Sequence, residues 1–563
     1  MNQRLYLAVV AILSSLSLAA CTSLPTSSSP SPFDVDAPNA QPVDLAAGGA
    51  VAAAVPESLL SRFLLACAAG ASDDYATARL FLTSSSAQTW DPHKLVTIYS
   101  TDSTPKVSYS FDPSKTDTLN ASITATGVGS VDQNGVLSPA ETSSLEARFH
   151  LVRENGQWRI DAPADGVVVS QASFTASHEL VSLMFLSATG DSLIADPRWY
   201  PTRRVETHML EGLIAGPQSH LSDALVNAIP SGTSISAGGI ELSDHVAKVS
   251  LNGTLPSDDR GKQLMAWEIS QTLQRSGRVN SVEINVGGEV LPSSGLPSQP
   301  SFDLDSAVAF NSNGLVRIDG RSVSTRILPI APSPSASLPA VSPVSSSLLA
   351  WREDDRLILV DSSTNATRVV DGSQGQYSPS IDRFGWVWDI PRGGNLRASR
   401  IDGQNLPIAS ENQSLSGVSA VRISPDGARA LLLRQVGGST SAWIAGIERR
   451  GSGEPIALTD PEPLAGLSTG VDDVSWAGRS TVVAVRQGGL RVGNDQVDEV
   501  SLVTVPVGGF PSVLALPTGT QRLSAGSSSA TMVIRGKDGN YQVRSGALWQ
   551  SLEGNLRDVN FPG

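Results

Sequence analysis

A phrase that recurs every 40 to 50 residues or so through the second half of the chain is the strongest constraint on its fold. Each copy joins a turn to an apolar strand pattern. The copies lie at Val341–Trp351, Ser380–Trp388, Ile423–Leu433, Val474–Val485 and Ser524–Ile534. This period is typical of propeller blades, and it predicts an all-β propeller over residues 301–563. Strands near Ala309–Ile318 could begin another blade, so the blade number stays open. A multi-sheet β-sandwich is the alternative.

The N-terminus has the layout of a secretory signal peptide over residues 1–20. Arg4 precedes an apolar run, Leu5–Leu13, which is shorter than the roughly 20 residues that span a bilayer. Cys21 directly follows a Leu-Ala-Ala triplet, and this arrangement resembles a bacterial lipobox. The resemblance implies an S-diacylglycerol group and an N-acyl group, such as palmitate, on Cys21. Several acyl chains would hold the protein stably on the outer face of the plasma membrane. A plain signal peptide is the alternative.

Residues 21–56 read as the lipidated cysteine and a flexible tether, because they contain few large apolar side chains. The net charge of −14 argues against partners such as nucleic acid or anionic lipid. The chain has 2 cysteines, so lipidation of Cys21 leaves Cys67 without an intramolecular partner. Cys67 lies in an apolar helical run and is expected to be a buried, inert thiol.

Residues 57–170 predict an α+β domain. Apolar residues from Leu59 to Leu64 recur at helical spacing, and a second helix is expected from Tyr75 to Leu82. Alternating strands follow, and the last of them turns at Glu154-Asn155-Gly156 into another strand, which is a hairpin signal. Helices followed by a curved sheet resemble the cone-shaped domains of the nuclear-transport-factor-2-like (NTF2-like) type.

Residues 178–292 predict a second α+β domain. A strand at Val181–Leu186 precedes a helix with apolar positions from Val205 to Leu213, which stops at Gly216-Pro217. A strand at Val246–Leu251, a helix from Arg260 to Arg275 and a final strand follow. The order of elements resembles the GerMN domain, a module first described in spore-germination proteins. No catalytic residues are known for that domain.

Candidate catalytic groups are sparse. The 6 histidines all precede residue 246, and none stands at metal-ligand spacing from another. Aspartates at Asp354-Asp355, Asp460 and Asp472-Asp473 could hold a cation in a propeller funnel, but solvated turn residues are the preferred interpretation. We therefore expect no catalytic residue, no cofactor and no metal site, and we expect that the chain is not an enzyme.

Two tryptophans form the one candidate for glycan contact. Trp386 and Trp388 are two residues apart and share one face of a strand, so they could stack on a sugar ring. Packing between blades is the alternative that we favour for them.

Several phrases in the same order resemble the actinobacterial lipoprotein LpqB family. They are Arg79–Asp91, Ala195–Trp199, Leu213–Pro217 and Arg422–Leu432, and the resemblance covers nearly the whole chain. It implies a lipidated Cys21 and no catalytic residue. It also implies a role beside the MtrA–MtrB two-component system, through contact with the extracellular domain of the membrane sensor kinase and with effects on cell-wall homeostasis and division.

The sequence thus supports three functional hypotheses. The first is a non-catalytic, extracytoplasmic membrane lipoprotein that modulates a sensor histidine kinase. The second is a lipoprotein that binds cell-wall glycan or muropeptide, with peptidoglycan as the partner and Trp386 and Trp388 as contacts. The third and weakest is a propeller hydrolase, against which the absence of histidine from residues 301–563 argues.

Overall fold

The computed structural model describes residues 48–49, 55–111, 114, 116–140, 144–325, 328, 330–391, 395–410, 412–488 and 500–563. The predicted signal peptide, Cys21 and most of the predicted tether lie outside the described residues. The chain divides into two units, residues 1–43 and 44–563, and only the second is described below. In the part of the chain that the structure describes, no helix has the length and apolarity needed to cross a membrane.

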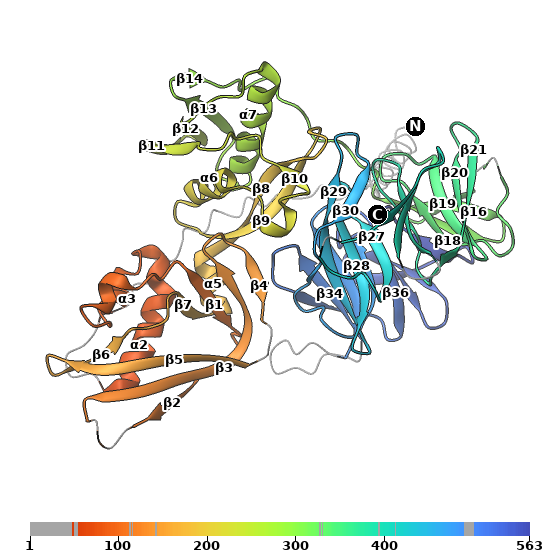
Figure 1. The fold of residues 1–563 in the computed structure, drawn as a ribbon. Coiled ribbons are helices and arrows are strands. Elements are labelled where there is room, and N and C mark those ends of the chain that lie inside the picture. The colour runs from red at the N-terminus through yellow and green to blue at the C-terminus, as the bar shows by residue number, and fades with distance from the viewer. Residues whose placement is uncertain are drawn as a thin grey trace, which may run out of the picture. The chain divides into compact units, whose positions relative to one another are not determined.

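The N-terminal domain places helices against a seven-stranded sheet with the path β6-β5-β3-β1-β7, to which β2 and β4 add by pairing with β3 (Figure 1). Its helical segments are α2 (Pro56–Ala69), η1 (Gly70–Ser72), α3 (Ala76–Arg79), α4 (Ser86–Thr89) and α5 (Gln171–Ser177). Its strands are β1 (Leu95–Tyr99), β2 (Lys106–Ser110), β3 (Thr118–Asp132), β4 (Leu137–Pro139), β5 (Ser144–Glu154), β6 (Gln157–Asp161) and β7 (Val167–Ser170).

The local signals explain most of this domain. Leu59, Leu60 and Phe63 recur at helical spacing, so α2 buries one face against the sheet. Asn155 and Gly156 both take positive φ and close the predicted β5–β6 hairpin. Cys67 is buried as predicted, and burial raises the pKa of its thiol.

The predicted helix from Tyr75 to Leu82 is wrong in extent, because only the four residues of α3 are helical. Asp74 and Tyr75 both adopt left-handed backbone angles, with φ of 54° and 59°. The Tyr75 ring packs edge-on against Trp90, with its centroid 6.2 Å away, and it closely approaches Gly70. Tertiary packing of this one ring therefore overrides the local helical periodicity.

The second domain contains two sheets, β10-β8-β9 and β11-β12-β13-β14, with helices α6 and α7 packed against them (Figure 1). Its helical segments are α6 (Val205–Ala215), η2 (Ser219–Leu221) and α7 (Asp259–Gln274). Its strands are β8 (His178–Ser187), β9 (Leu193–Pro201), β10 (Leu225–Val226), β11 (Ser234–Ser243), β12 (Val246–Asn252), β13 (Ser281–Val286) and β14 (Glu289–Val290).

Both long helices of this domain begin or end where the sequence indicates. The α6 helix stops at Gly216, which takes φ 99° and is followed by Pro217. The Asp258 side chain accepts a hydrogen bond from the Gly261 amide and caps α7. The apolar faces of α6 and α7 pack into one core with β8, β12 and β13.

The C-terminal domain is the predicted propeller, and its sheets number six among the described residues. They are β17-β16-β15-β40, β18-β19-β20-β21, β22-β24-β25-β26 with β23, β27-β28-β29-β30 with β31, β32-β33-β34-β35 and β36-β37-β38-β39. The strands of the first three blades are β15 (Ser306–Asn311), β16 (Gly314–Asp319), β17 (Ser322–Thr325), β18 (Ser337–Val341), β19 (Leu348–Glu353), β20 (Arg356–Asp361), β21 (Ala366–Asp371), β22 (Ser373–Gln374), β23 (Ser380–Ile381), β24 (Val387–Pro391), β25 (Leu396–Ser399) and β26 (Asn405–Ile408).

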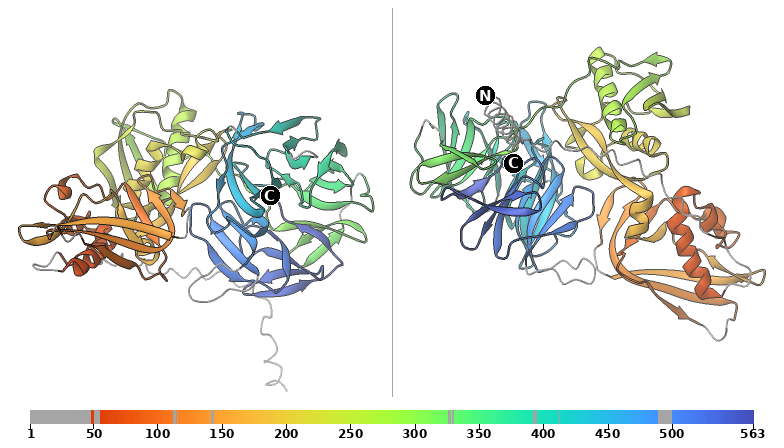
Figure 2. Two further views of the ribbon diagram at one scale, coloured as in Figure 1. Left: turned by 60° about the horizontal axis from the view of Figure 1, so that its bottom comes forward. Right: turned by 180° about the vertical axis from the view of Figure 1, so that it is seen from behind.

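The remaining strands are β27 (Val418–Ile423), β28 (Arg429–Val436), β29 (Ser439–Arg449), β30 (Pro455–Leu458), β31 (Glu462–Pro463), β32 (Val471–Trp476), β33 (Thr481–Gln487), β34 (Val500–Pro506), β35 (Ser512–Ala515), β36 (Thr520–Ala525), β37 (Met532–Gly536), β38 (Tyr541–Ser545), β39 (Leu548–Leu552) and β40 (Arg557–Asn560). The last strand, β40, joins the first blade by pairing with β15. The left view of Figure 2 looks onto the blades, and the chain ends near their centre.

The structure therefore agrees with the predicted order of an N-terminal α+β domain, a second α+β domain and an all-β propeller. The second α+β domain is called the GerMN domain below, after the resemblance noted in its sequence. The three domains share cores, which the sequence did not indicate. Trp199 of β9 belongs to the core of the N-terminal domain, and Ala428 of the propeller belongs to the core of the GerMN domain. A Cβ atom on Gly446 would lie 3.1 Å from the Ala224 side chain, so the propeller backbone approaches the GerMN domain closely.

Candidate functional site

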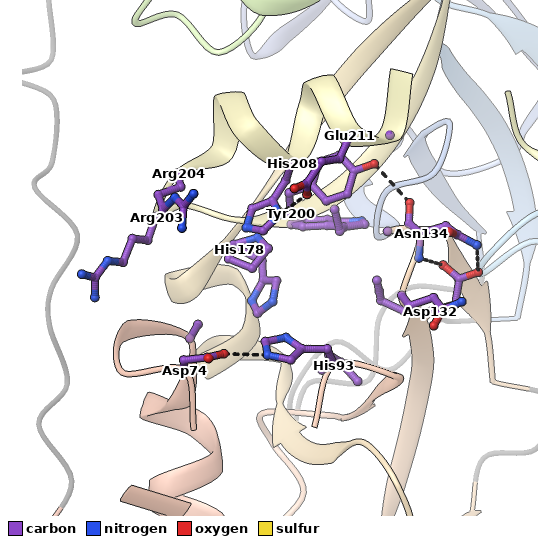
Figure 3. A pocket seen from close by; sticks show the side chains of 18 of the residues that line it. Asp74, His93, Asp132, Asn134, His178, Tyr200, Arg203, Arg204, His208 and Glu211 are labelled. Carbon is purple, nitrogen blue, oxygen red and sulfur yellow. Dashed lines mark hydrogen bonds and ion pairs between the residues drawn. The ribbon is translucent and has the colours of Figure 1, made fainter. Parts of the chain in front are cut away.

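A cavity of about 910 Å³ lies between the N-terminal domain and the GerMN domain (Figure 3). The N-terminal domain contributes the segments that carry Asp74, His93 and Asp132–Gly135. The GerMN domain contributes His178, the end of β9 and helix α6. Both domains therefore build the cavity, and an occupant would contact side chains of each.

Two histidine–carboxylate pairs line the cavity, one from each domain. His93 Nε2 lies 2.7 Å from Asp74 Oδ1 in the N-terminal domain. His208 Nδ1 lies 3.3 Å from Glu211 Oε2, three residues further along α6. Figure 3 shows the two pairs coming from different elements toward the same space. Such pairs present hydrogen-bond donors and acceptors, and they can bind polar groups of either charge.

A third histidine lies between these pairs and is buried. His178 is 8% exposed, and its ring stacks on Phe174 with a centroid separation of 4.5 Å. The Ser177 hydroxyl lies 2.9 Å from His178 Nδ1. Burial, followed by repulsion from His208 and His93, lowers the pKa of His178 to about 4. At neutral pH His178 is therefore an uncharged imidazole.

At the back of the cavity, backbone carbonyls of one turn in the N-terminal domain accept hydrogen bonds from residues of the GerMN domain. The Arg198 guanidinium donates to the Asn134 carbonyl at 2.9 Å, and the Tyr200 hydroxyl donates to the same oxygen at 3.3 Å. The Trp199 amide donates to the Gly135 carbonyl at 2.8 Å. Gly135 has φ 79°, and a Cβ atom there would lie 2.7 Å from the Trp199 carbonyl oxygen. Only glycine fits this approach.

Three residues that line the cavity hold left-handed backbone angles without being glycine. They are Asp74, Tyr75 and Arg204, with φ between 54° and 59°. Such angles cost free energy in non-glycine residues, and they concentrate at functional sites. The loop before α3 and the start of α6 are thus held in unusual conformations where they face the cavity.

The structure contradicts the predicted glycan contact at Trp386 and Trp388. The two side chains are 1% and 0% exposed, inside a core shared by neighbouring blades. The Trp388 indole nitrogen donates to the Asp382 carboxylate at 3.0 Å. Neither ring has a free face for a sugar, and the packing role that we weighed against stacking is the correct one.

The aspartates singled out in the propeller do not come together. Asp354 lies in the β19–β20 turn and Asp460 accepts hydrogen bonds from Ser410 and Asn412, as turn residues do. Asp473 is only 3% exposed, so the expectation of a solvated residue is wrong there. Its burial raises its pKa, against the attraction of Arg422 and Arg522. Among the described residues no group of His, Cys, Asp and Glu side chains could hold a metal.

Sequence reasoning missed the cavity. His93, His178 and His208 are separated by tens of residues, so spacing rules for a single element could not group them. The predicted lipid-attachment residue, Cys21, lies outside the described residues and stays a prediction. The three histidines come together because β9 packs on the N-terminal domain through Trp199 and Tyr200.

Comparison with protein families matches three models in order. Residues 49–175 match the N-terminal domain of lipoprotein LpqB, and residues 313–562 match the lipoprotein LpqB beta-propeller domain. Residues 182–292 match a model described as sporulation and spore germination. Together the two LpqB models cover most of the chain.

Curated relatives carry the name lipoprotein LpqB. The Streptomyces coelicolor protein is 28% identical, with 91% of this chain and 90% of the relative aligned. The Rhodococcus opacus protein is 26% identical over 86% of each chain. The Cutibacterium acnes protein is 34% identical over 40% of this chain and 37% of its own length.

Solved structures show more distant similarity. The tandem GerMN domains of GerM from Bacillus subtilis are 15% identical and align with a TM-score of 0.17, covering 26% of this chain and 63% of that one. TolB from Acinetobacter baumannii is 14% identical with a TM-score of 0.32, covering 71% of this chain and 90% of that one. The ordered family matches and the relatives aligned along nearly the full length agree with the three domains of the structure. The chain belongs to the lipoprotein LpqB family.

Proposed function

We propose that this lipoprotein is non-catalytic, is held by acyl chains on Cys21 at the outer face of the plasma membrane, and modulates a membrane sensor histidine kinase. Its relatives are named as lipoproteins, and the N-terminal motif that resembles a lipobox supplies the attachment site. The kinase, of the type that pairs with a response regulator in cell-wall homeostasis and division, presents an extracellular domain in the same membrane. A shared membrane raises the effective concentration of the two proteins, so a weak contact suffices.

The observation that carries this proposal is the cavity built by two domains. A kinase segment that enters it meets His93 and Asp74 on one side and His208 and Glu211 on the other. Binding there changes how the N-terminal and GerMN domains are held, which is the kind of coupling that a modulator needs. The cavity offers hydrogen bonds and charges of both signs to such a segment.

The test is direct binding between the lipid-free chain, residues 22–563, and the extracellular domain of the cognate sensor kinase. Domain truncations are unsuitable, because Trp199 and Ala428 contribute to cores of neighbouring domains. We therefore use point variants at the cavity, Asp74→Asn and His208→Gln. We expect the unmodified chain to bind saturably. Each variant should weaken this binding about tenfold, which corresponds to a loss of about 1.4 kcal/mol of binding free energy.

Glu241→Gln is the matched control, since Glu241 is an exposed residue of β11 that does not line the cavity. It should bind the kinase domain as the unmodified chain does. Absence of binding at high micromolar concentrations would remove the proposed partner, whereas binding that the cavity variants leave intact would move the contact to another surface.

Membrane attachment is tested separately with Cys21→Ala. The variant should appear in the soluble fraction or remain unprocessed, and it should take up no labelled fatty acid. Normal lipid labelling of Cys21→Ala would contradict the proposed anchor.

A further inference from the structure

Arg429 is a buried cation whose side chain lacks a carboxylate partner. It is the first residue of β28, two positions after the last residue of the Ser424-Pro425-Asp426-Gly427 turn, and it is 1% exposed. One guanidinium nitrogen, Nη2, donates to the Ala195 carbonyl of the GerMN domain. Its other nitrogens, Nε and Nη1, are buried and meet no hydrogen-bond acceptor among the described residues.

Several other arginines that are buried or partly buried among the described residues form an ion pair with a carboxylate. Arg198 pairs with Asp196, Arg397 with Asp389, and Arg449 with Asp382, each at 2.8 Å. Burying a guanidinium without a counter-charge or full hydrogen bonding costs several kcal/mol, so such groups are normally paired. Arg429 forms no ion pair of this kind among the described residues, and its unused N–H groups are the donors that an external anion would need.

Asp196 directly follows Ala195, the residue whose carbonyl accepts from Arg429, and its carboxylate is already engaged. Asp196 accepts hydrogen bonds from the Arg198 guanidinium at 2.8 Å and from the Gln218 amide at 2.9 Å. Glu462 lies 3.6 Å from His220 Nδ1, at the same junction, with half of its side chain exposed. Asp196 and Glu462 thus each lie beside another basic side chain.

Arg429 lines a cavity of about 60 Å³ where all three domains meet. Leu137 of the N-terminal domain, Gln218 and His220 of the GerMN domain, and Glu462 of the propeller also line it. A water molecule needs about 10 to 15 Å³ of such space, so the cavity has room for a compact ion. It is far too small for a nucleotide or a sugar.

We infer that this cavity binds a small inorganic oxyanion, such as phosphate or sulfate, between Arg429 and the GerMN domain. The N–H groups of Nε and Nη1 are charged donors, and such donors form strong hydrogen bonds with the oxygens of a tetrahedral oxyanion. The bound ion neutralises Arg429 and ties the three domains together at one point. Glu462 opposes binding through its negative charge, which keeps the affinity moderate.

The test is thermal unfolding of the lipid-free chain, residues 22–563, in increasing sodium phosphate or sodium sulfate. Sodium chloride holds the ionic strength constant at pH 7.5. The midpoint should rise saturably, by about 2 °C or more at tenfold the dissociation constant. Isothermal titration with phosphate should give one site per chain.

Arg429→Met should abolish the saturable rise, and the exposed Arg450→Met is the matched control that should retain it. Glu462→Gln should lower the half-saturating phosphate concentration about threefold or more, because a repelling charge is gone. This second variant keeps the inference testable if Arg429→Met does not fold.

A rise that never saturates and is equal in Arg429→Met is the general effect of excluded salts and would overturn the inference. No rise at all would mean that Arg429 is satisfied by water alone. The inference does not depend on the proposed sensor-kinase role, since neither outcome involves the kinase.

Discussion

At the scale of single residues, surroundings rather than residue type set the chemistry of the cavity. His93 and His208 sit beside carboxylates, whereas His178 is stacked on Phe174 and 8% exposed. The same side chain therefore lies beside a carboxylate at two places and is buried against an aromatic ring at the third. Because His178 also lies at the joint between two domains, its protonation is coupled to stability.

The stability of the chain should fall as pH drops from about 6.5 toward 4. The unfolded His178 takes up a proton near its ordinary pKa of 6.5, but the folded residue stays neutral until about 4. The unfolded state therefore binds more protons over this window, and a shift of this size corresponds to about 3 kcal/mol. Urea unfolding of the chain at a series of pH values measures this loss in the free energy of unfolding.

The variant His178→Gln should lose this part of the pH dependence, because glutamine does not titrate. His245→Gln is the control, since His245 is exposed and outside the cavity. Equal pH profiles for His178→Gln and the unmodified chain would show that His178 is not the responsible group.

At the scale of elements, helix α6 packs closely against β9 at a single glycine, Gly212. A Cβ atom on Gly212 would lie 2.0 Å from the Tyr200 hydroxyl and 3.0 Å from a methyl group of Leu183. Tyr200 is 6% exposed and donates to the Asn134 carbonyl across the domain joint. Glycine lowers the helix propensity at this position, but its lack of a side chain lets α6 pack on β9.

Gly212→Ala should therefore destabilise the chain by about 1 to 3 kcal/mol, although alanine favours a helix by about 1 kcal/mol over glycine. Adding Tyr200→Phe should recover part of the loss, because it removes the atom that the new methyl group meets. Equilibrium urea unfolding gives both values. Greater stability in Gly212→Ala than in the unmodified chain would refute the proposed close fit; Glu211→Ala, on the exposed side of α6, should change little.

At the scale of the whole molecule, the described domains are held by shared cores and by closure of the propeller. The Trp199 indole donates to the Gly508 carbonyl at 2.8 Å, and Phe510 packs on Trp199 with ring centroids 5.2 Å apart. One tryptophan of the GerMN domain thus contacts both other domains. The propeller closes through β40, whose residues Arg557 and Asn560 pair with β15.

Removing residues 553–563 should open the propeller. The first blade then loses its innermost strand, and apolar residues of β15 such as Val308 lose their cover. We expect a lower thermal midpoint and faster trypsin cleavage than for the full chain. Arg557→Ala, which keeps β40 and changes only an exposed side chain, should match the unmodified chain; the same midpoint in the truncated chain would contradict the closing role of β40.

The sequence by itself determined the features that depend on neighbouring residues. Strand alternation with Asn155-Gly156 encodes a hairpin, Gly216-Pro217 stops α6, and the recurring blade phrase encodes a propeller, because each signal is a local period or a local backbone requirement. These signals predicted the class of all three domains.

Only the tertiary structure decided what depends on contacts between distant segments. It set the blade number through the pairing of β15 with β40, buried Trp386, Trp388 and Asp473, and shortened the helix at Tyr75. It also brought His93, His178 and His208 to one cavity and left Arg429 without a carboxylate. Such features arise where domains meet, and the residues that meet there carry no shared period along the chain.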